Sequence, residues 1–197
     1  MKAVLFISYF LFCFSSNAQF SSECFDEAKQ KIVKDAKEGV FGQKDSTGMI
    51  YITPEQRAGY FIGCKFPYAP LRSYDDKEIN PINIKADLTI INYNYTYCQE
   101  CLLQLDKLMA FKKESKKDIK IIVLFKEKKE DLKEIIEKYK DHLFIAADAE
   151  NWMKAYNLGM GYPLNYILDK NKSIKYLISG GSYDDTDEFS KTLRAIK

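Results

Sequence analysis

The chain has 197 residues with a formal net charge of +2, and 46% of its residues are hydrophobic while 29% are charged. This length suits one domain with additional elements, and the apolar content is sufficient for a packed core. The nearly balanced charge argues against a nucleic-acid-binding protein, which usually carries a strong basic excess.

The first 18 residues have the pattern of a secretory signal peptide. Lys2 provides a charged start, an apolar run extends from Ala3 to Phe14, and the small residues of a cleavage site end at Ala18. The run is shorter than the ~20 residues that a membrane-spanning helix needs. We therefore expect cleavage after Ala18 and a mature protein without a membrane span. The pattern predicts export, to a periplasm or into the medium, with membrane tethering as an alternative.

Residues 19–60 are expected to form an N-terminal extension. Its main element is a helix at Ser22–Lys37, capped by a serine at its start and ended by Gly39. Short strands are predicted at Met49–Thr53 and Tyr60–Cys64.

Residues 61–197 alternate between apolar strands and amphipathic helices, after an irregular proline-containing connection at Phe66–Pro81. Strands are predicted at Leu88–Tyr93, Ile119–Phe125, Leu143–Ala147, Leu164–Leu168 and Ile174–Ser179. Helices are predicted at Cys98–Glu114, Lys129–Lys140, Ala149–Tyr156 and Thr186–Ile196, the last capped by Thr186. This order indicates an α/β domain whose central mixed sheet is covered by helices on both faces.

Two cysteines, Cys98 and Cys101, lie where the first long strand ends and a helix begins. A helix N-terminus stabilises a thiolate, which lowers its pKa and makes it a nucleophile near neutral pH. Cys101 lies one helical turn further on and faces the same side. The pattern therefore predicts attack of Cys98 on a disulfide and resolution by Cys101.

Other interpretations of the pair are less well supported by the sequence. A zinc site needs four nitrogen or sulfur ligands, and the chain has one histidine, His142, and no second CxxC. A copper(I) site formed by Cys98, Cys101 and His142 is the alternative function. A structural staple is disfavoured because the closed loop is very short.

The mature chain would contain two further cysteines, Cys24 and Cys64. In an oxidising compartment an even number of cysteines allows complete pairing. If Cys98 pairs with Cys101, then Cys24 and Cys64 remain for each other.

The sequence Asn92-Tyr-Asn-Tyr-Thr-Tyr-Cys98-Gln-Glu-Cys101 resembles the motif of the thioredoxin superfamily, in particular the exported TlpA/ResA-like thiol–disulfide oxidoreductases. Gly161-Tyr162-Pro163 before the strand that ends in Asp169 matches a second family motif. The resemblance covers about Gly63–Gly181. It implies a thioredoxin fold with an N-terminal helical extension, and a cis-proline at 163 that borders a substrate groove with Tyr162.

The resemblance also assigns roles to residues around the cysteines. Tyr97 stands where tryptophan is usual and is expected to cover the site. Asn92 and Gln104 occupy positions at which related proteins carry a proton-accepting acid, so deprotonation of Cys101 requires water or another group. Glu100 lies beside the thiols, where its charge disfavours a thiolate on Cys98 and favours the disulfide.

These features predict a thiol–disulfide oxidoreductase that acts as a reductant more readily than as an oxidant. Its expected partners are protein substrates with a disulfide or dithiol and an upstream redox protein that supplies electrons. The chemistry requires no cofactor beyond the two cysteines.

Overall fold

The computed structural model describes residues 23–40, 43–44, 50–181 and 186–197. The expected signal peptide at residues 1–18 and the expected serine cap of the first helix lie outside the described residues. Among the helices of the described part, none is long and apolar enough to cross a membrane.

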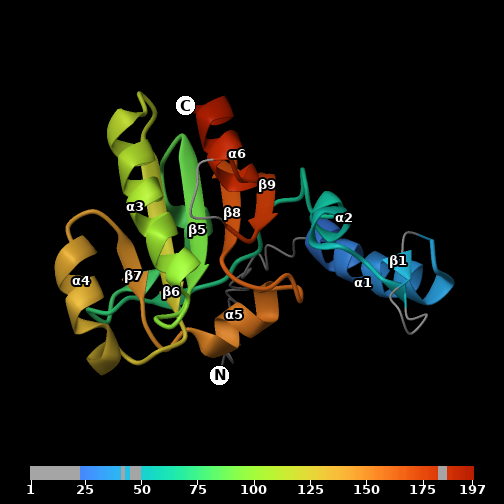
Figure 1. Ribbon diagram of the computed structural model, residues 1–197, viewed down its shortest axis with the longest axis horizontal. Coiled ribbons are helices and arrows are strands. Elements are labelled where there is room, and N and C mark those ends of the chain that lie inside the picture. Colours follow the sequence, from blue (N-terminus) through green and yellow to red (C-terminus); the bar gives the residue numbers. More distant parts are fainter. Residues whose placement is uncertain (1–22, 41–42, 45–49, 182–185) are drawn as a thin grey trace, which may run out of the picture.

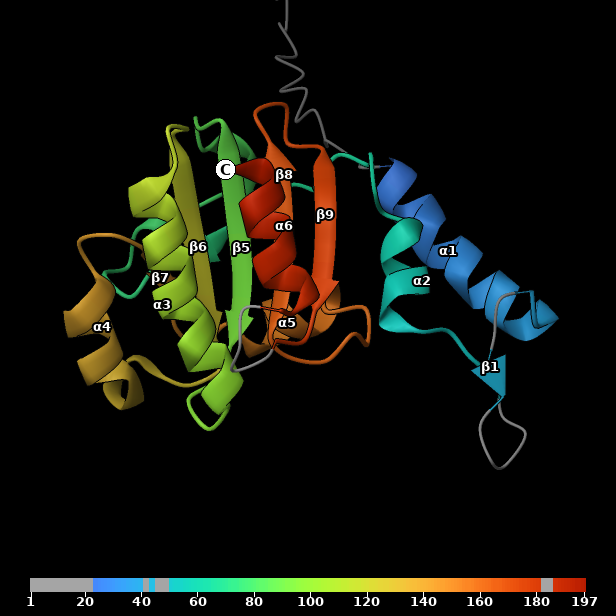
Figure 2. The same cartoon turned by 45° about the horizontal axis from the view of Figure 1, so that its top comes forward.

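The described residues include a five-stranded mixed sheet, shown in Figures 1 and 2. Its order is β7-β6-β5-β8-β9, formed by β5 (Leu88–Asn94), β6 (Ile119–Phe125), β7 (Phe144–Ala146), β8 (Leu164–Asp169) and β9 (Ile174–Ser179). β6 runs parallel to both β5 and β7, whereas β8 is antiparallel to β5 and β9. The predicted central mixed sheet is confirmed.

Every residue of β5 is buried, because this strand lies in the middle of the sheet and is covered on both faces. Alternating side chains of the strands contribute to two separate cores. Ile90 belongs to the core beneath α3 (Gln99–Glu114), α4 (Lys133–Tyr139) and α6 (Glu188–Ile196). Ile91 belongs to the opposite core, which includes side chains of α5 (Glu150–Tyr156) and α1 (Glu23–Glu38).

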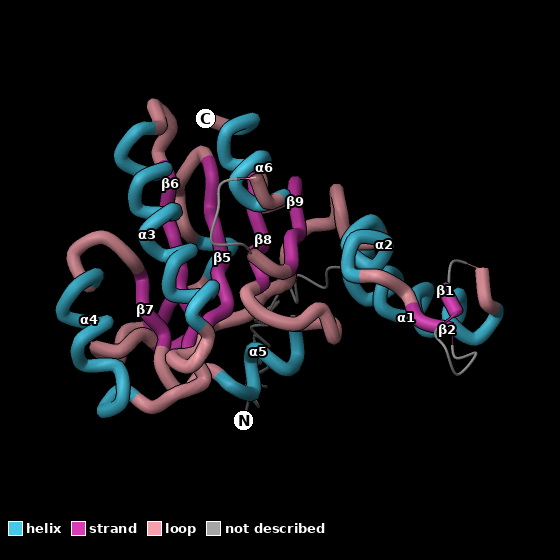
Figure 3. The backbone as a smooth tube through the Cα atoms, viewed as in Figure 1, coloured by secondary structure: helices cyan, strands magenta, loops and turns pink. Residues whose placement is uncertain are grey.

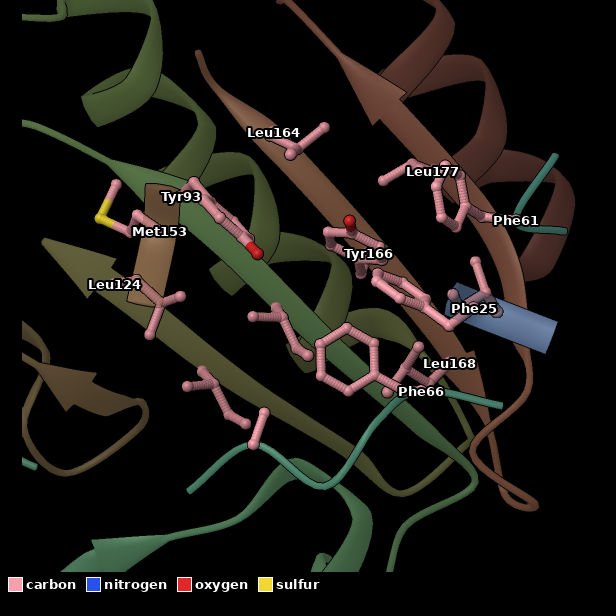
Figure 4. Packing of buried hydrophobic residues seen from close by; sticks show 14 of the residues in the cluster. Phe25, Phe61, Phe66, Tyr93, Leu124, Met153, Leu164, Tyr166, Leu168 and Leu177 are labelled. Atoms are coloured by element: carbon pink, nitrogen blue, oxygen red, sulfur yellow. The ribbon is translucent and has the colours of Figure 1, made fainter. Parts of the chain in front are cut away.

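The second core is rich in aromatic side chains, and Figure 4 shows how they gather on one face of β5 and β8. The ring centroids of Phe25 and Phe61 lie 4.8 Å apart, and those of Phe66 and Tyr166 lie 5.2 Å apart. Aromatic pairs at such distances add stability beyond the area they bury. The Phe25 ring also lies 6.2 Å from the Phe66 ring, between centroids, and so anchors the start of α1 to the sheet domain.

The N-terminal segment contains α1, a short hairpin of β1 (Gln43–Lys44) and β2 (Ile50–Tyr51), and α2 (Pro54–Gly59). Figures 2 and 3 show α1 and α2 side by side, beyond the β9 edge of the sheet. A disulfide between Cys24 and Cys64, with a Cα–Cα distance of 5.5 Å, links α1 to the segment that follows α2.

A second contact holds the C-terminal part of α1 against Tyr60. The buried carboxylate of Asp35 accepts hydrogen bonds from the Tyr60 hydroxyl at 2.6 Å and from Lys31 Nζ at 2.8 Å. These hydrogen bonds lower the pKa of Asp35. Burial and the Asp35 carboxylate raise the pKa of Tyr60 to about 12.

The strand predicted at Tyr60–Cys64 is wrong, because these residues form turns after the unpredicted helix α2. The sequence does contain the signal for α2. Thr53 Oγ1 accepts from the Gln56 amide at 3.3 Å, and the Thr53 amide donates to Gln56 Oε1 at 3.1 Å, which is a capping box. Pro54 occupies the first helical position, where its lack of an N–H costs nothing.

Two helix boundaries also differ from the expectation. The cap of α6 is Asp187, whose carboxylate accepts from the Ser190 amide at 2.5 Å, rather than Thr186. The helix predicted at Lys129–Lys140 divides into a 3₁₀ turn, η2 (Lys129–Leu132), and α4. The connection Phe66–Pro81 contains a small hairpin of β3 (Leu71–Arg72) and β4 (Glu78–Ile79), followed by η1 (Pro81–Asn83).

Candidate functional site

Cys98 and Cys101 lie just beyond the carboxyl end of the central strand β5, where α3 begins. Figure 2 shows this junction of β5 and α3. Cys98 is the N-cap of α3, and its Sγ accepts from the Cys101 amide at 3.1 Å. The two residues form a disulfide with a Cα–Cα distance of 5.2 Å. The Cys98 side chain is therefore held against the positive end of the helix dipole, which favours a thiolate on this sulfur after reduction.

The two cysteines differ in their access to solvent. Cys98 retains 6% of its surface, whereas Cys101 is fully buried beneath it. The nucleophile of a disulfide exchange needs access to the partner, while the resolving thiol acts from within the protein. The burial thus matches attack by Cys98 and resolution by Cys101.

A second loop reaches the same site. The Tyr162–Pro163 peptide bond is cis, and Pro163 is buried immediately before β8. The Tyr162 ring meets the Tyr95 ring edge-on, with centroids 5.5 Å apart. Since Tyr95 begins the turn that ends at Cys98, this contact brings the proline loop beside the cysteine loop.

Two tyrosines offer exposed ring surface around the pair. Tyr97 is 89% exposed, and Tyr162 is 38% exposed. Burial is the main cause of a raised pKa of Tyr162, and the carboxylates of Glu150 and Glu127 add to it. Both rings belong to the loops that meet at the cysteines, so their exposed faces are available for contacts near the pair.

Four buried amide side chains lie next to the start of α3 and form one hydrogen-bonded cluster, which we call the amide cluster: Asn92, Asn94, Asn165 and Gln104. Gln104 Oε1 accepts from Asn165 Nδ2 at 2.9 Å and from Asn92 Nδ2 at 3.3 Å. Asn92 Nδ2 also donates to Asn165 Oδ1 at 2.7 Å, and Asn94 Nδ2 donates to Asn92 Oδ1. Asn92 and Gln104, predicted separately to shape the site, thus lie together.

The amide cluster also connects α3 to the proline loop. Gln104 Nε2 donates to the Gly180 carbonyl at 2.9 Å, and the Gly180 amide donates to the Pro163 carbonyl at 2.8 Å. A Cβ at Gly181 would lie 2.7 Å from Gln104 Nε2 and 3.5 Å from Pro163 Cγ. The chain after β9, the proline loop and the first turns of α3 are therefore in direct contact.

The acidic side chains near the site lie outside the amide cluster. Glu100 lies in the first turn of α3, as its position in the sequence implied, and is half-buried there. Glu127, which sequence reasoning missed, lies two residues after β6 and accepts from the Thr96 amide at 3.1 Å. The sequence offered no signal for this contact, because the two residues lie 31 positions apart.

The structure does not bring His142 to the cysteines. β5, β6 and β7 run parallel, Cys98 follows the carboxyl end of β5, and His142 precedes the amino end of β7. The histidine therefore lies at the opposite end of the sheet. Within the described residues, no group of three or more His, Cys, Asp or Glu side chains is placed to hold a metal ion.

Solved structures provide the comparison with known proteins. The thioredoxin domain of a thiol-disulfide oxidoreductase from Bacteroides vulgatus matches with a TM-score of 0.55 at 17% identity, over 68% of this chain and 96% of that chain. A protein described as a thiol:disulfide interchange protein DsbE from Chlorobium tepidum matches with a TM-score of 0.56 at 14% identity, over 68% of this chain and 96% of that chain.

A third match is a thiol:disulfide interchange protein from a Bacteroides species, with a TM-score of 0.51 at 16% identity, over 68% of this chain and 87% of that chain. No family model and no curated protein matches the sequence. The structural matches show that this chain has the thioredoxin fold, as the sequence motifs predicted.

Proposed function

We propose that this protein is a thiol–disulfide oxidoreductase whose redox centre is the Cys98–Cys101 pair. The observation that carries the proposal is the disulfide at the N-terminus of α3, beside the cis Tyr162–Pro163 loop, in a thioredoxin fold. The partly accessible Cys98 is the nucleophile and the buried Cys101 is the resolving residue. Residues 61–197 form the redox unit in this proposal, and residues 19–60 form the extension.

The reaction begins with the reduced pair. The Cys98 thiolate attacks one sulfur of a substrate disulfide, which forms a mixed disulfide and expels the other substrate sulfur as a thiolate that takes up a proton. Cys101 then loses its proton and attacks the Cys98 sulfur. The second substrate thiolate leaves, the Cys98–Cys101 disulfide forms, and two electrons have passed to the substrate.

A dithiol partner protein must reverse this change by reducing the Cys98–Cys101 disulfide, since each turnover consumes two electrons. The proposed direction is reductive, because the half-buried carboxylate of Glu100 in the first turn of α3 opposes a thiolate next to it. The proposed location is outside the cytoplasm, on the basis of the N-terminal pattern of residues 1–18. The periplasm of a bacterium is the proposed compartment because the motifs resemble those of exported TlpA/ResA-like proteins.

Trapping of the mixed disulfide tests the proposal. The Cys101→Ser variant of the mature protein can form the adduct with an oxidised protein substrate such as insulin, but it cannot resolve the adduct. We expect a covalent adduct that is visible by intact mass and is lost on addition of dithiothreitol.

The matched control is the double variant Cys98→Ser, Cys101→Ser, which keeps the second disulfide but lacks the nucleophile. The control should give no adduct. An adduct of equal yield in the control, or no adduct in the single variant and no insulin reduction by the wild type, would contradict the proposed function.

The copper(I) alternative loses its third ligand, because His142 lies at the other end of the sheet. It depends on the two thiols alone and stays a prediction. The structure offers no separate observation in its favour.

A further inference from the structure

Glu127 joins two segments that leave the sheet side by side. Asn94 and Phe125 are the last paired residues of β5 and β6, so the chain after β5 runs next to the chain after β6. Glu127 Oε1 accepts from both the amide and the hydroxyl of Thr96, at 3.1 and 3.2 Å. One carboxylate oxygen therefore binds two donors of the loop that precedes the cysteines.

Thr96 lies inside the turn that presents Cys98. The Cys98 amide donates to the Tyr95 carbonyl at 3.1 Å, which closes the turn around Thr96 and Tyr97. The backbone of Glu127 is itself fixed, because its carbonyl accepts from the Asp148 amide at 2.7 Å. The carboxylate thus holds the cysteine loop to a fixed point just after the carboxyl end of β6.

The other carboxylate oxygen is not explained by this anchoring. Glu127 Oε2 is buried and has no hydrogen-bond partner among the described residues. The neighbouring Lys126 places its ammonium over the Tyr95 ring, 4.5 Å from the centroid. Burial of a carboxylate oxygen without a partner costs stability, and an amide side chain could hold Thr96 without a charge. A carboxylate at this position therefore needs an explanation beyond the anchoring of Thr96.

We propose that Glu127 is a positioning residue of the dithiol site: it holds the turn before Cys98, and its negative charge opposes a thiolate on that residue. The inference rests on the proposed function and deepens it. An anion hydrogen-bonded to the loop before Cys98 makes the reduced form less favourable relative to the disulfide, so Glu127 acts in the same direction as Glu100 and favours a reductant.

Three variants separate the two parts of this role. Glu127→Gln keeps an oxygen acceptor for Thr96 and removes the charge. Thr96→Ala removes the hydroxyl donor and keeps both the backbone donor and the charge. Glu130→Gln removes a charge from an exposed position three residues further on and is the matched control.

The readout is the equilibrium of the Cys98–Cys101 pair with glutathione in the full mature protein. We expect Glu127→Gln to shift this equilibrium toward the dithiol by about three- to tenfold, because a unit charge is removed across a single, partly screened backbone turn. A tenfold shift corresponds to about 30 mV. The alkylation of Cys98 by iodoacetamide should reach its half-maximal rate at a lower pH than in the wild type.

Thr96→Ala should leave the glutathione equilibrium within about twofold of wild type and should slow insulin reduction, because the turn loses one of its two anchors. Glu130→Gln should change neither quantity. Equal equilibria for Glu127→Gln, Glu130→Gln and wild type would overturn the inference. Wild-type reduction of insulin in the same experiment would show that the proposed function stands without it.

Discussion

Replacement of Gln104 by glutamate converts the neutral amide cluster into one that can ionise. Gln104 Oε1 faces the Nδ2 donors of Asn92 and Asn165, whereas Nε2 faces the carbonyl of Gly180. In the Gln104→Glu variant the first oxygen keeps both donors. The second oxygen replaces a donor and faces an acceptor, so it needs a proton to restore that hydrogen bond.

The magnitude follows from the burial of the site. Gln104 is 1% exposed, so solvent cannot replace the lost donor. We expect the introduced carboxyl to have a folded-state pKa about 2 units above the value of ~4.3 for a free glutamate. A shift of 2 units corresponds to about 2.7 kcal/mol of stability.

The sign of the effect follows from linkage. The folded-state pKa is raised, so the stability associated with the protonated carboxyl is fully present below the unfolded value and is lost as pH rises through the folded value. The free energy of unfolding of the Gln104→Glu variant should therefore be close to that of the wild type at about pH 4 and lower by about 2–3 kcal/mol at pH 8.

Urea unfolding of the oxidised protein at several pH values measures this effect. Lys113→Glu, at an exposed position on the same helix, is the control for a new carboxylate on α3. A Gln104→Glu variant whose stability relative to wild type is the same at pH 4 and pH 8 would refute the reasoning, as would a variant that gains stability as pH rises.

Three further predictions concern other parts of the structure. Removal of the Cys24–Cys64 disulfide by the double Cys-to-Ser change should lower the free energy of unfolding by about 2–4 kcal/mol, because the disulfide links residues 40 positions apart. The redox equilibrium of the Cys98–Cys101 pair should not change. Urea unfolding measures the stability and glutathione titration the redox equilibrium, and an unchanged urea midpoint would contradict the expected loss of stability. Asp35→Asn should abolish the loss of stability that the lowered pKa of Asp35 causes as pH falls from about 5 toward 2, and should bring the pKa of Tyr60 down from about 12. Tyrosine ¹³C shifts follow that pKa, which stays in place if the contact does not exist in solution. Gly181→Ala should destabilise by about 1 kcal/mol, because Gln104 must give up its bond to Gly180, whereas Gly59→Ala, with nothing within 4 Å of the new Cβ, should not; equal unfolding midpoints for the two variants would argue against the contact.

Local patterns were sufficient to predict the sheet domain. The continuous apolar run Ile119–Phe125 marks a strand covered on both faces, and its bounds agree with β6. The change from strand to helix periodicity predicts that the CxxC pair lies at a strand–helix junction, which agrees with Cys98 as the N-cap of α3. Thr53, Pro54 and Gln56 provide the start signal of α2, but this helix is only 6 residues long, too short to show a helical periodicity in the sequence.

Contacts between distant segments could not be predicted in the same way. The amide cluster depends on Asn165, which is 73 positions from Asn92 and is brought to it by the antiparallel pairing of β5 and β8. The contact of Glu127 with Thr96 depends on the parallel register of β5 and β6. No periodicity in the sequence encodes such registers, so polar residues that meet across them remain hidden until the sheet is known.

The reduction potential of the Cys98–Cys101 pair tests the central claim most directly. The mature protein is equilibrated in thiol redox buffers, and free thiols are trapped and counted by intact mass, with the Cys98→Ser, Cys101→Ser variant reporting the contribution of Cys24 and Cys64. We expect a reversible two-electron couple near or below the thioredoxin value of about −270 mV. A pair that never forms a disulfide, or a couple near the strongly oxidising value of about −120 mV, would contradict it.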